Sequence, residues 1–433
     1  DYLAQAIRKG AAVCVVSKHV WVEGDVTVIR VRNTSEAMAW IARNYYGAPA
    51  EAMQMIGITG TKGKTTTACM LYQMLKEAGV KCGLIGTLGV RRSDGLKKPG
   101  SNTTPDALVL QKELREMADA GCSCCVMEVS SQGLKHYRVE GITFAIGIYT
   151  NLSMDHIGPG EHRSFREYAC CKKRLFERSR MICINADDKY HGFMTADLSA
   201  PVYTYGIEQP CDVKAEHIIY ERSSRGLNVT YQTTGWIKDE IVLKMPGTAN
   251  VYNSLAAMEA AHLLGISPET IRKTLRNVSV KGRIEEVRIS DKFDVVIDYA
   301  HNAASLESLI KTLRQYQPKR LVLLFGCGGN RSPLRRFQMG ETAGRLSDVT
   351  ILTSDNPRYE KPEAILSDIE QGMKRTKGKY KIIPDRREAI SYAISQAQEG
   401  DLIVVAGKGH EEYQEIEGHF YPMNEREMIE NSI

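Results

Sequence analysis

The chain has 433 residues, 43% of them hydrophobic and 25% charged, which is the balance of an ordinary soluble globular protein of two or three domains. No apolar stretch approaches the length of a membrane span and no secretion signal is recognisable, so we expect a cytoplasmic protein. The formal net charge of +5 is small and is not gathered in a run, so charge alone does not separate a phosphate-bearing substrate from nucleic acid.

The first fifty residues predict the remnant of a domain. Residues 2–9 have a helical pattern although the chain starts at Asp1 without a methionine, so we expect that an upstream portion is missing. Residues 11–16 then predict a strand, and residues 34–45 predict a helix.

A glycine-rich turn, Gly57-Ile-Thr-Gly-Thr-Lys-Gly-Lys-Thr-Thr-Thr67, is the most informative segment of the chain. Residues 53–58 predict a strand before it and residues 65–78 a helix after it, so that N–H groups at the helix N-terminus face an anion. Lys64 would then reach the outer phosphates of a nucleotide, and the hydroxyl of Thr65 would bind magnesium. Because the standard phosphate loop has glycine at the position of Ile58, an ordinary strand-to-helix turn is the alternative.

The rest of the chain alternates short apolar runs with helical patterns. Predicted helices lie at 106–120 and 267–277, and predicted buried strands lie at 124–129 and 145–149. After residue 283 the alternation resumes, with strands at 293–299, 321–325, 349–353 and 402–406 and helices at 303–316 and 362–374. This alternation predicts an α/β fold of parallel sheets with helices on both faces. We expect three domains, at 1–50, 51–282 and 283–433.

The eleven cysteines lack the spacing of a zinc site. Cys122, Cys124 and Cys125 cluster, as do Cys170 and Cys171, but no second CxxC or Cys/His pair completes a set. Since most of them lie in apolar runs, we expect buried free thiols in a reducing cytoplasm.

Polar clusters directly follow predicted strands in both halves of the chain, at 128–131, 150–156, 298–301, 326–331, 354–358 and 407–411. Ligands of open α/β sheets bind at the carboxyl ends of strands, which is where these clusters are expected to lie. Any one of them could be an ordinary turn, because Gly, Asn, Asp and Pro favour turns. Six clusters at the same end of two sheets favour ligand sites.

Taken together, these segments resemble the Mur ligase family, the ATP-dependent ligases that build the peptide stem of bacterial cell-wall precursors. Gly60-Thr-Lys-Gly-Lys-Thr-Thr66 is similar to the phosphate loop of that family, which accounts for Ile58. Asn102-Thr-Thr-Pro105, Met127-Glu-Val-Ser-Ser131, Asp298-Tyr-Ala-His301, Asp355-Asn-Pro-Arg358 and Gly407-Lys-Gly-His-Glu411 look like the members that add the third residue of the peptide. The resemblance implies a truncated UDP-substrate domain, a central phosphate-loop ATPase domain and a Rossmann-like, amino-acid-binding C-terminal domain.

The reaction implied by the resemblance forms an amide through an acyl phosphate. ATP, with Mg²⁺, would phosphorylate the D-glutamate γ-carboxylate of UDP-N-acetylmuramoyl-L-alanyl-D-glutamate, and the amine of meso-diaminopimelate would displace phosphate. Such chemistry depends on positioning and on neutralising charge. The implied partners are these small molecules alone, without nucleic acid or membrane, and the implied state is a monomer.

The family's catalytic and metal positions match Lys64, Thr65, Glu128, His156 and Lys172. The pattern Tyr-x-x-x-Lys-x-x-Leu-Phe implies that Lys172 carries a carbamate derived from CO2, which would make it an anion able to help hold magnesium. From the residues alone, this segment is an amphipathic helix with a solvated basic face, and Lys173 competes with Lys172 for the role.

The positions implied to contact ATP are Gly60, Thr61, Lys62, Gly63, Lys64, Thr65, Thr66, Asn250, Asn253, Arg283, Asp298 and His301. Those implied to contact the UDP-linked acceptor are Thr103, Thr104, Ser130, His136 and Arg138. Those implied to contact the incoming amino acid are Arg331, Asp355, Asn356, Pro357, Arg358, Gly407 and Glu411.

The identity of the amino acid rests on Arg358, because a guanidinium fork pairs with the extra carboxylate that diaminopimelate has and lysine lacks. Lysine is the first alternative, since Ile157-Gly-Pro-Gly-Glu-His162 is similar to a variant found in lysine-using relatives. A second alternative is folylpolyglutamate synthase, which the segments at 128–131 and 355–358 fit poorly. A third, from another class, is a non-catalytic nucleotide-binding scaffold of the same fold.

Overall fold

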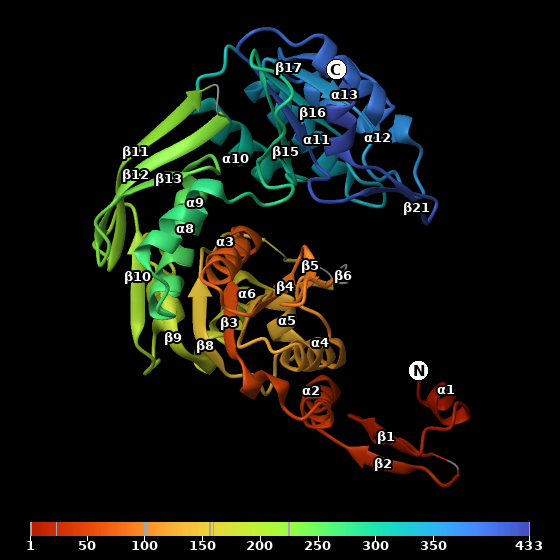
Figure 1. Ribbon diagram of the computed structural model, residues 1–433. Coiled ribbons are helices and arrows are strands. Elements are labelled where there is room, and N and C mark those ends of the chain that lie inside the picture. The colour runs from red at the N-terminus through yellow and green to blue at the C-terminus, as the bar shows by residue number, and fades with distance from the viewer. Residues whose placement is uncertain are drawn as a thin grey trace. The chain divides into compact units, whose positions relative to one another are not determined.

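The computed structural model describes residues 2–22, 24–98, 102–155, 157–158, 160–223 and 226–432. The chain divides into two compact units (Figure 1). Unit 1 contains Asp1–Lys214 and Leu255–Ile271, and unit 2 contains Ala215–Ser254 and Arg272–Ile433. No helix within the described ranges has the length and apolar character that crossing a membrane requires.

Unit 1 begins with a small part made of α1 (Leu3–Arg8), the parallel pair β1 (Val13–Val16) and β2 (Thr27–Arg30), and α2 (Thr34–Tyr45). Its main sheet has the strand order β10-β9-β8-β3-β7-β4-β5-β6. The strands are β3 (Gln54–Thr59), β4 (Cys82–Gly86), β5 (Gly89–Arg91), β6 (Lys97–Lys98), β7 (Cys124–Glu128), β8 (Phe144–Tyr149), β9 (Ser179–Asn185) and β10 (Val202–Gly206). The helical segments are η1 (Pro49–Ala52), α3 (Lys64–Glu77), α4 (Ala107–Asp119), α5 (Ser131–Lys135), α6 (Phe165–Lys173), η2 (Phe176–Arg178) and α7 (His191–Thr195).

The central strands of this sheet are parallel, as the sequence predicts. β3 pairs with β7 and β8, with Ile58 opposite both Glu128 and Ile148. This register places the carboxyl ends of the three strands together, and with them the segments that follow Thr59, Glu128 and Tyr149. The sheet is not purely parallel at the edge formed by β5 and β6, because β5 pairs antiparallel with β4 and β6 pairs antiparallel with β5.

Three elements cross the division between the units: β11 (Val213–Ser223), α8 (Thr248–Leu263) and α9 (Pro268–Asn277). Unit 2 also holds β12 (Gly226–Gly235) and β13 (Glu240–Leu243), which pair antiparallel. The sequence analysis predicts no helix or strand between residues 180 and 247, where the structure has β10 to β13.

The second sheet, of unit 2, has the order β14-β15-β19-β16-β17-β18 and is parallel from β15 to β18. Its strands are β14 (Glu285–Glu286), β15 (Asp294–Asp298), β16 (Arg320–Phe325), β17 (Val349–Leu352), β18 (Lys379–Ile382) and β19 (Asp401–Ala406). Its helices are α10 (Ala303–Arg314), α11 (Pro333–Leu346), α12 (Pro362–Met373), α13 (Arg386–Ser395) and α14 (Glu425–Glu430). A hairpin of β20 (Tyr413–Ile416) and β21 (His419–Pro422) follows β19.

Helices cover both faces of this second sheet. Val322 and Leu324 of β16 pack in one cluster with Ile390 of α13 and Ile429 of α14. Leu323 lies between them and is also fully buried, and alternate residues of a strand face opposite sides. The sheet is therefore buried on both faces, which explains the continuous apolar runs of its strands.

All eleven cysteines are free, and nine of them are buried. Cys170 is exposed and Cys211 is intermediate. The prediction of buried free thiols is confirmed for most of the set.

Candidate active site

The glycine-rich turn joins β3 to α3 at the carboxyl end of the unit 1 sheet. Gly60 has φ +155° and Gly63 has φ +87°, conformations that side-chain-bearing residues rarely adopt. A Cβ placed on Gly60 would lie 1.9 Å from the Thr150 hydroxyl oxygen. These two positions therefore require glycine, whereas position 58 lies within the strand and tolerates isoleucine.

The segment after β8 holds this turn in place. The Thr61 N–H donates to the Asn151 carbonyl at 2.9 Å, and the Lys62 N–H donates to Asn151 Oδ1 at 2.9 Å. The Thr150 hydroxyl donates to the Lys62 carbonyl at 2.7 Å. Because two N–H groups of the turn are engaged by Asn151, the N–H groups best placed to bind phosphate are those of the first turn of α3.

Lys64 is the first residue of α3, and its ammonium lies across the turn. Nζ donates to the carbonyls of Gly60 at 2.9 Å and Thr61 at 3.1 Å. This geometry places a positive charge beside the helix N-terminus, where the helix dipole also favours an anion.

Glu128 ends β7 and meets the start of α3. Its carboxylate is 2% exposed and accepts hydrogen bonds from the Thr65 hydroxyl at 2.9 Å and the Thr87 N–H at 2.8 Å. The Thr87 hydroxyl donates to it as well, at 3.2 Å. The structure thus brings together two of the predicted metal-binding residues and adds Thr87, which the sequence analysis missed. His156, the third predicted position, lies outside the described residues.

A hydroxyl and a carboxylate are hard oxygen donors of the kind that Mg²⁺ prefers, so Thr65 and Glu128 fit that ion. Within the described ranges, no three His, Cys, Asp or Glu side chains gather in a way that could hold a metal by themselves. Mg²⁺ in proteins usually keeps several waters and binds one or two carboxylates together with phosphate oxygens, which a site built on Thr65 and Glu128 would allow.

Lys172 on α6 points into the core of unit 1 and is 1% exposed. Its Nζ donates to the Gly60 carbonyl at 2.7 Å and lies 4.6 Å from the centre of the Tyr168 ring. Burial, followed by the nearby charge of Lys64, lowers the pKa of Lys172 well below its ordinary value. The alternative of a solvated basic face is wrong for Lys172, whereas Lys173 is partly exposed and lies over Phe193.

The predicted acceptor-binding residues cluster around the end of β7. Thr87 and Thr103 share a hydrogen bond of 3.0 Å between their hydroxyls. The Thr104 hydroxyl is fully buried and bonds the Glu128 carbonyl at 3.0 Å and Ser130 Oγ at 3.1 Å. Arg138 donates to the Thr104 carbonyl at 2.9 Å. The buried Thr104 side chain therefore helps to position Glu128 and Ser130. Thr103 and Arg138 are less buried, so their side chains are more accessible to a ligand.

The ATP-binding residues predicted in unit 2 fall in two groups. Asn250 and Asn253 are buried on α8, where they share a hydrogen bond of 3.0 Å. Arg283 lies 4.9 Å from the Tyr299 ring centre, beside the segment that contains Asp298 and His301. Asp298 accepts the N–H groups of Ile284 and Ala300, and burial raises its pKa.

Most of the predicted amino-acid contacts in unit 2 follow β17 and β19, and two of them, Asn356 and Glu411, belong to one hydrogen-bonded cluster. Asn356 Nδ2 donates to Glu411 Oε2 at 2.8 Å. Lys408, fully buried, donates to Asn356 Oδ1 at 2.8 Å and to Glu411 Oε2 at 3.4 Å. The sequence analysis missed Lys408, although its position between Gly407 and Gly409 directly after a buried strand is a usable signal.

Arg358 belongs to the same loop and is anchored by the β20–β21 hairpin. Nε donates to Glu415 Oε2 at 2.8 Å, and Nη1 donates to the Gly329 carbonyl at 2.8 Å. Its backbone, with φ +53°, also bonds Glu415 and Glu417. Nη2 has no acceptor among the described residues, and the side chain is 24% exposed. Arg331 is exposed on the neighbouring segment.

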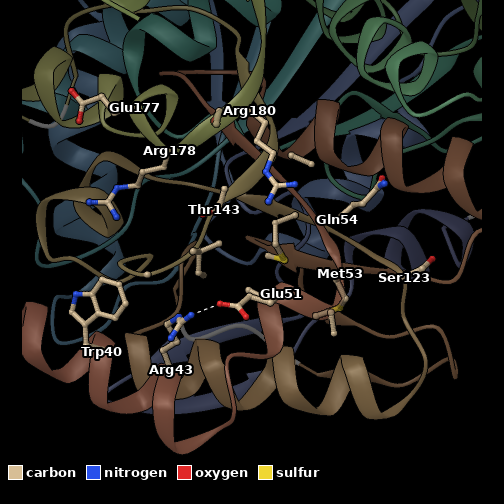
Figure 2. A pocket seen from close by; sticks show the side chains of 17 residues that line it. Trp40, Arg43, Glu51, Met53, Gln54, Ser123, Thr143, Glu177, Arg178 and Arg180 are labelled. Atoms are coloured by element: carbon tan, nitrogen blue, oxygen red, sulfur yellow. Dashed lines mark hydrogen bonds and ion pairs between the residues drawn. The ribbon is translucent and has the colours of Figure 1, made fainter. Parts of the chain in front are cut away.

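A cavity of about 970 Å³ lies elsewhere in unit 1, at the amino ends of the strands (Figure 2). Gln54 at the start of β3 and Arg180 on β9 line it, and Arg43 of α2 turns toward Glu51 to form an ion pair. The carboxyl ends of the strands, where the glycine-rich turn lies, are at the other end of the sheet. This cavity is therefore separate from the predicted phosphate site.

Comparison with known proteins places these features in a family. The Mur ligase middle domain matches residues 58–261, and the Mur ligase glutamate ligase domain matches residues 282–409. The chain is 42% identical over 433 residues to the UDP-N-acetylmuramoyl-L-alanyl-D-glutamate--2,6-diaminopimelate ligase of Caldanaerobacter subterraneus subsp. tengcongensis, covering 100% of this chain and 89% of that protein. It is 40% identical over 446 residues to the ligase of the same name from Geobacillus kaustophilus, with the same coverage.

A solved structure of a ligase with that name superposes with a TM-score of 0.71 and 30% identity, over 99% of this chain and 88% of that one. Mycobacterium tuberculosis folylpolyglutamate synthase superposes with a TM-score of 0.68 at 17% identity, over 87% of this chain and 93% of that one, a likeness of fold alone. The chain is a member of the Mur ligase family of ATP-dependent ligases.

Proposed function

We propose that this protein joins meso-diaminopimelate to the D-glutamate γ-carboxylate of UDP-N-acetylmuramoyl-L-alanyl-D-glutamate, with ATP converted to ADP and phosphate. Its relatives at about 40% identity over the whole chain carry that activity in their names. The observation that carries the choice of amino acid is Arg358, whose Nη2 has no acceptor among the described residues. Its loop also carries Asn356, which donates to Glu411. We place the reaction in the cytoplasm, where ATP is available.

The first step joins two anions, the γ-carboxylate and the γ-phosphate, and ADP leaves as the acyl phosphate forms. Lys64 and the first turn of α3 would hold the phosphates and offset their charge. In the second step the amine attacks the acyl carbon, phosphate leaves, and the nitrogen loses a proton. The amide then links the two parts.

Magnesium, when bound, supplies charge that draws the phosphate oxygens together. Thr65 and Glu128 would hold it, with His156 as a further position suggested by the family resemblance. Thr87 keeps the Glu128 carboxylate in place through two hydrogen bonds, so its role is to orient that group.

Lys172 is the proposed site of a carbamate, formed when its neutral amine adds to CO2 and releases a proton. The lowered pKa of Lys172 supports this, because only the unprotonated amine is a nucleophile. A carbon-13 NMR signal from protein equilibrated with labelled bicarbonate, absent from Lys172→Met, is the expected result. Equal signals from both proteins would reject the carbamate.

The proposed activity is tested by following ADP release in the presence of the UDP-linked acceptor and either diaminopimelate or lysine. Diaminopimelate should give the faster release by at least about a hundredfold, because its extra carboxylate can accept from Nη2 of Arg358, whereas lysine offers that guanidinium no acceptor. A faster reaction with lysine would replace the proposed substrate by the alternative.

The same assay separates an enzyme from a non-catalytic scaffold. Lys64→Ala should lower the rate by about a hundredfold or more, because charge neutralisation at the phosphates is lost. Lys76→Ala, exposed in the last turn of the same helix, is the matched control and should keep the rate of the unchanged protein. If Lys64→Ala has no effect, the glycine-rich turn is not the phosphate site.

A further inference from the structure

Arg386 lies buried beneath the two loops that carry the proposed amino-acid contacts. It is the first residue of α13, and its side chain is 0% exposed. Nη1 donates to the Ser354 carbonyl at 3.0 Å, and Nη2 donates to the Ala406 carbonyl at 2.9 Å. One guanidinium thus contacts both loops at once.

The two carbonyls stand at the points where the loops begin. Ser354 directly precedes residues 355–358, and Ala406 ends β19 just before residues 407–411. In the sheet, β16 lies between β17 and β19, so no ladder hydrogen bond joins the ends of these two strands. Arg386 spans that gap with a rigid, planar group whose donors point in fixed directions.

The loops above this contact lie close together. A Cβ placed on Gly407 would lie 2.7 Å from Asp355 Oδ2. The hydrogen bonds of Asn356 to Glu411 and of Lys408 to Asn356, both 2.8 Å, also run from one loop to the other. A small change in the separation of the loops would break this cluster.

Glu425, the first residue of α14, balances the charge of Arg386. It is 2% exposed and accepts from Nε of Arg386 at 2.6 Å. Burial raises the pKa of Glu425, and the neighbouring guanidinium opposes that shift. Apolar residues can often replace a buried ion pair without loss of stability, but they could not bond the two carbonyls. What an apolar replacement of Arg386 and Glu425 would lose is therefore the pair of hydrogen bonds from Arg386 to the Ser354 and Ala406 carbonyls.

We propose that Arg386 is a positioning residue for the incoming amino acid, which holds the loops at 355–358 and 407–411 at the separation where Asn356 and Glu411 contact it together. In this role the buried Arg386 side chain does not itself contact the substrate. The inference rests on the proposed function, since it assigns these loops to the amino-acid site.

The test compares Arg386→Lys with Arg320→Lys. Lysine keeps the positive charge opposite Glu425 but cannot reach both carbonyls. Arg320 is the matched control, because it pairs with buried Asp401 at the amino ends of β16 and β19, away from the loops. For each variant we would measure the unfolding temperature, kcat, and the KM of ATP, of the UDP-linked acceptor and of diaminopimelate.

Arg386→Lys should raise the KM of diaminopimelate about tenfold or more, while the KM of ATP and of the acceptor stay within about twofold. Arg320→Lys should lower the unfolding temperature and leave all three KM values unchanged. If Arg386→Lys does not fold, the neutral pair Arg386→Gln with Glu425→Gln leaves no buried charge unpaired, and the same shift in KM is expected from it.

An unchanged KM of diaminopimelate, or an equal rise in all three KM values, would overturn the role of Arg386. A failure of the proposed function looks different, because the unsubstituted protein would then release no ADP with diaminopimelate at all.

Discussion

At the scale of single residues, the site depends on partners that are far apart in sequence. Thr65 and Glu128 are separated by 63 positions and meet at 2.9 Å. The residue types and the family resemblance single out both of them, but only the register of β3 against β7 shows that they share a hydrogen bond. Thr87 carries no distinctive pattern of its own, whereas Lys408 lies between two glycines directly after a buried strand and could have been recognised. The sequence analysis missed both of these groups, which bond Glu128 and Asn356.

His410 gives a prediction for the dependence of stability on pH. Burial, together with the charges of Arg283, Lys281 and Lys408, lowers the pKa of His410 from 6.5 to about 4. Its Nδ1 is buried without a hydrogen-bond partner among the described residues, and its ring packs 4.8 Å from that of Tyr299. The folded protein therefore keeps His410 neutral at pH values where the unfolded chain is protonated.

Between pH 6.5 and about 4 the unfolded state binds the extra proton, so His410 makes the free energy of unfolding fall as the pH is lowered through this window. Between pH 7 and pH 5 we expect the free energy of unfolding of the unchanged protein to fall by about 2 kcal/mol more than that of His410→Gln. Urea titrations at the two pH values measure the difference. All other titratable groups are the same in both proteins, so their contributions cancel. Parallel losses in the two proteins would show that His410 is not buried in its neutral form.

At the scale of elements, the apolar runs of the sequence locate most strands and helices. The helix predicted at 34–45 is α2, the helix at 106–120 is α4 with one residue less at each end, and the strand at 321–325 is β16 with one more residue. Long buried runs are easy to recognise because parallel strands are covered on both sides. The residues of β11 and β12 alternate between more buried and more exposed positions, and this pattern is weaker than a continuous apolar run, so the sequence analysis missed both strands.

The glycine-rich turn gives a prediction at this scale. Gly60→Ala should disrupt the turn, because a Cβ would meet the Thr150 hydroxyl at 1.9 Å in a backbone conformation that alanine rarely adopts. Gly192→Ala is the matched control, since a Cβ there has nothing within 4 Å. The first variant should lose ATP turnover by about a hundredfold while the second keeps it. Full turnover in Gly60→Ala would mean that the turn adapts to a side chain.

At the scale of the whole molecule, the chain consists of two units, and each carries part of the proposed chemistry. The phosphate and metal residues lie in unit 1, and the proposed amino-acid contacts lie in unit 2. The sequence predicts the α/β class and the two sheets, because both have buried parallel strands. The domain boundaries at 50 and 282 stay predictions, since a boundary depends on long-range packing that local patterns do not encode.

The cysteines give a prediction for the molecule as a whole. In the folded protein a thiol reagent such as dithionitrobenzoate should react quickly with Cys170 and slowly with Cys211, whose pKa burial raises to about 11. The other nine thiols should react only after denaturation. Counting the thiols that react before and after guanidinium is added measures this, with Cys170→Ser as the control. Fast reaction of three or more thiols in the folded protein would contradict the burial described.

The ion pair of Arg358 with Glu415 has a consequence for how the proposed amino-acid site responds to salt. The Glu415 carboxylate, 2.8 Å from Nε of Arg358, is a counterion within the protein. Dissolved chloride or sulfate should therefore bind weakly to this guanidinium. The affinity for a zwitterionic amino acid would then depend only weakly on ionic strength, because Glu415 of the hairpin already neutralises much of the charge of the guanidinium.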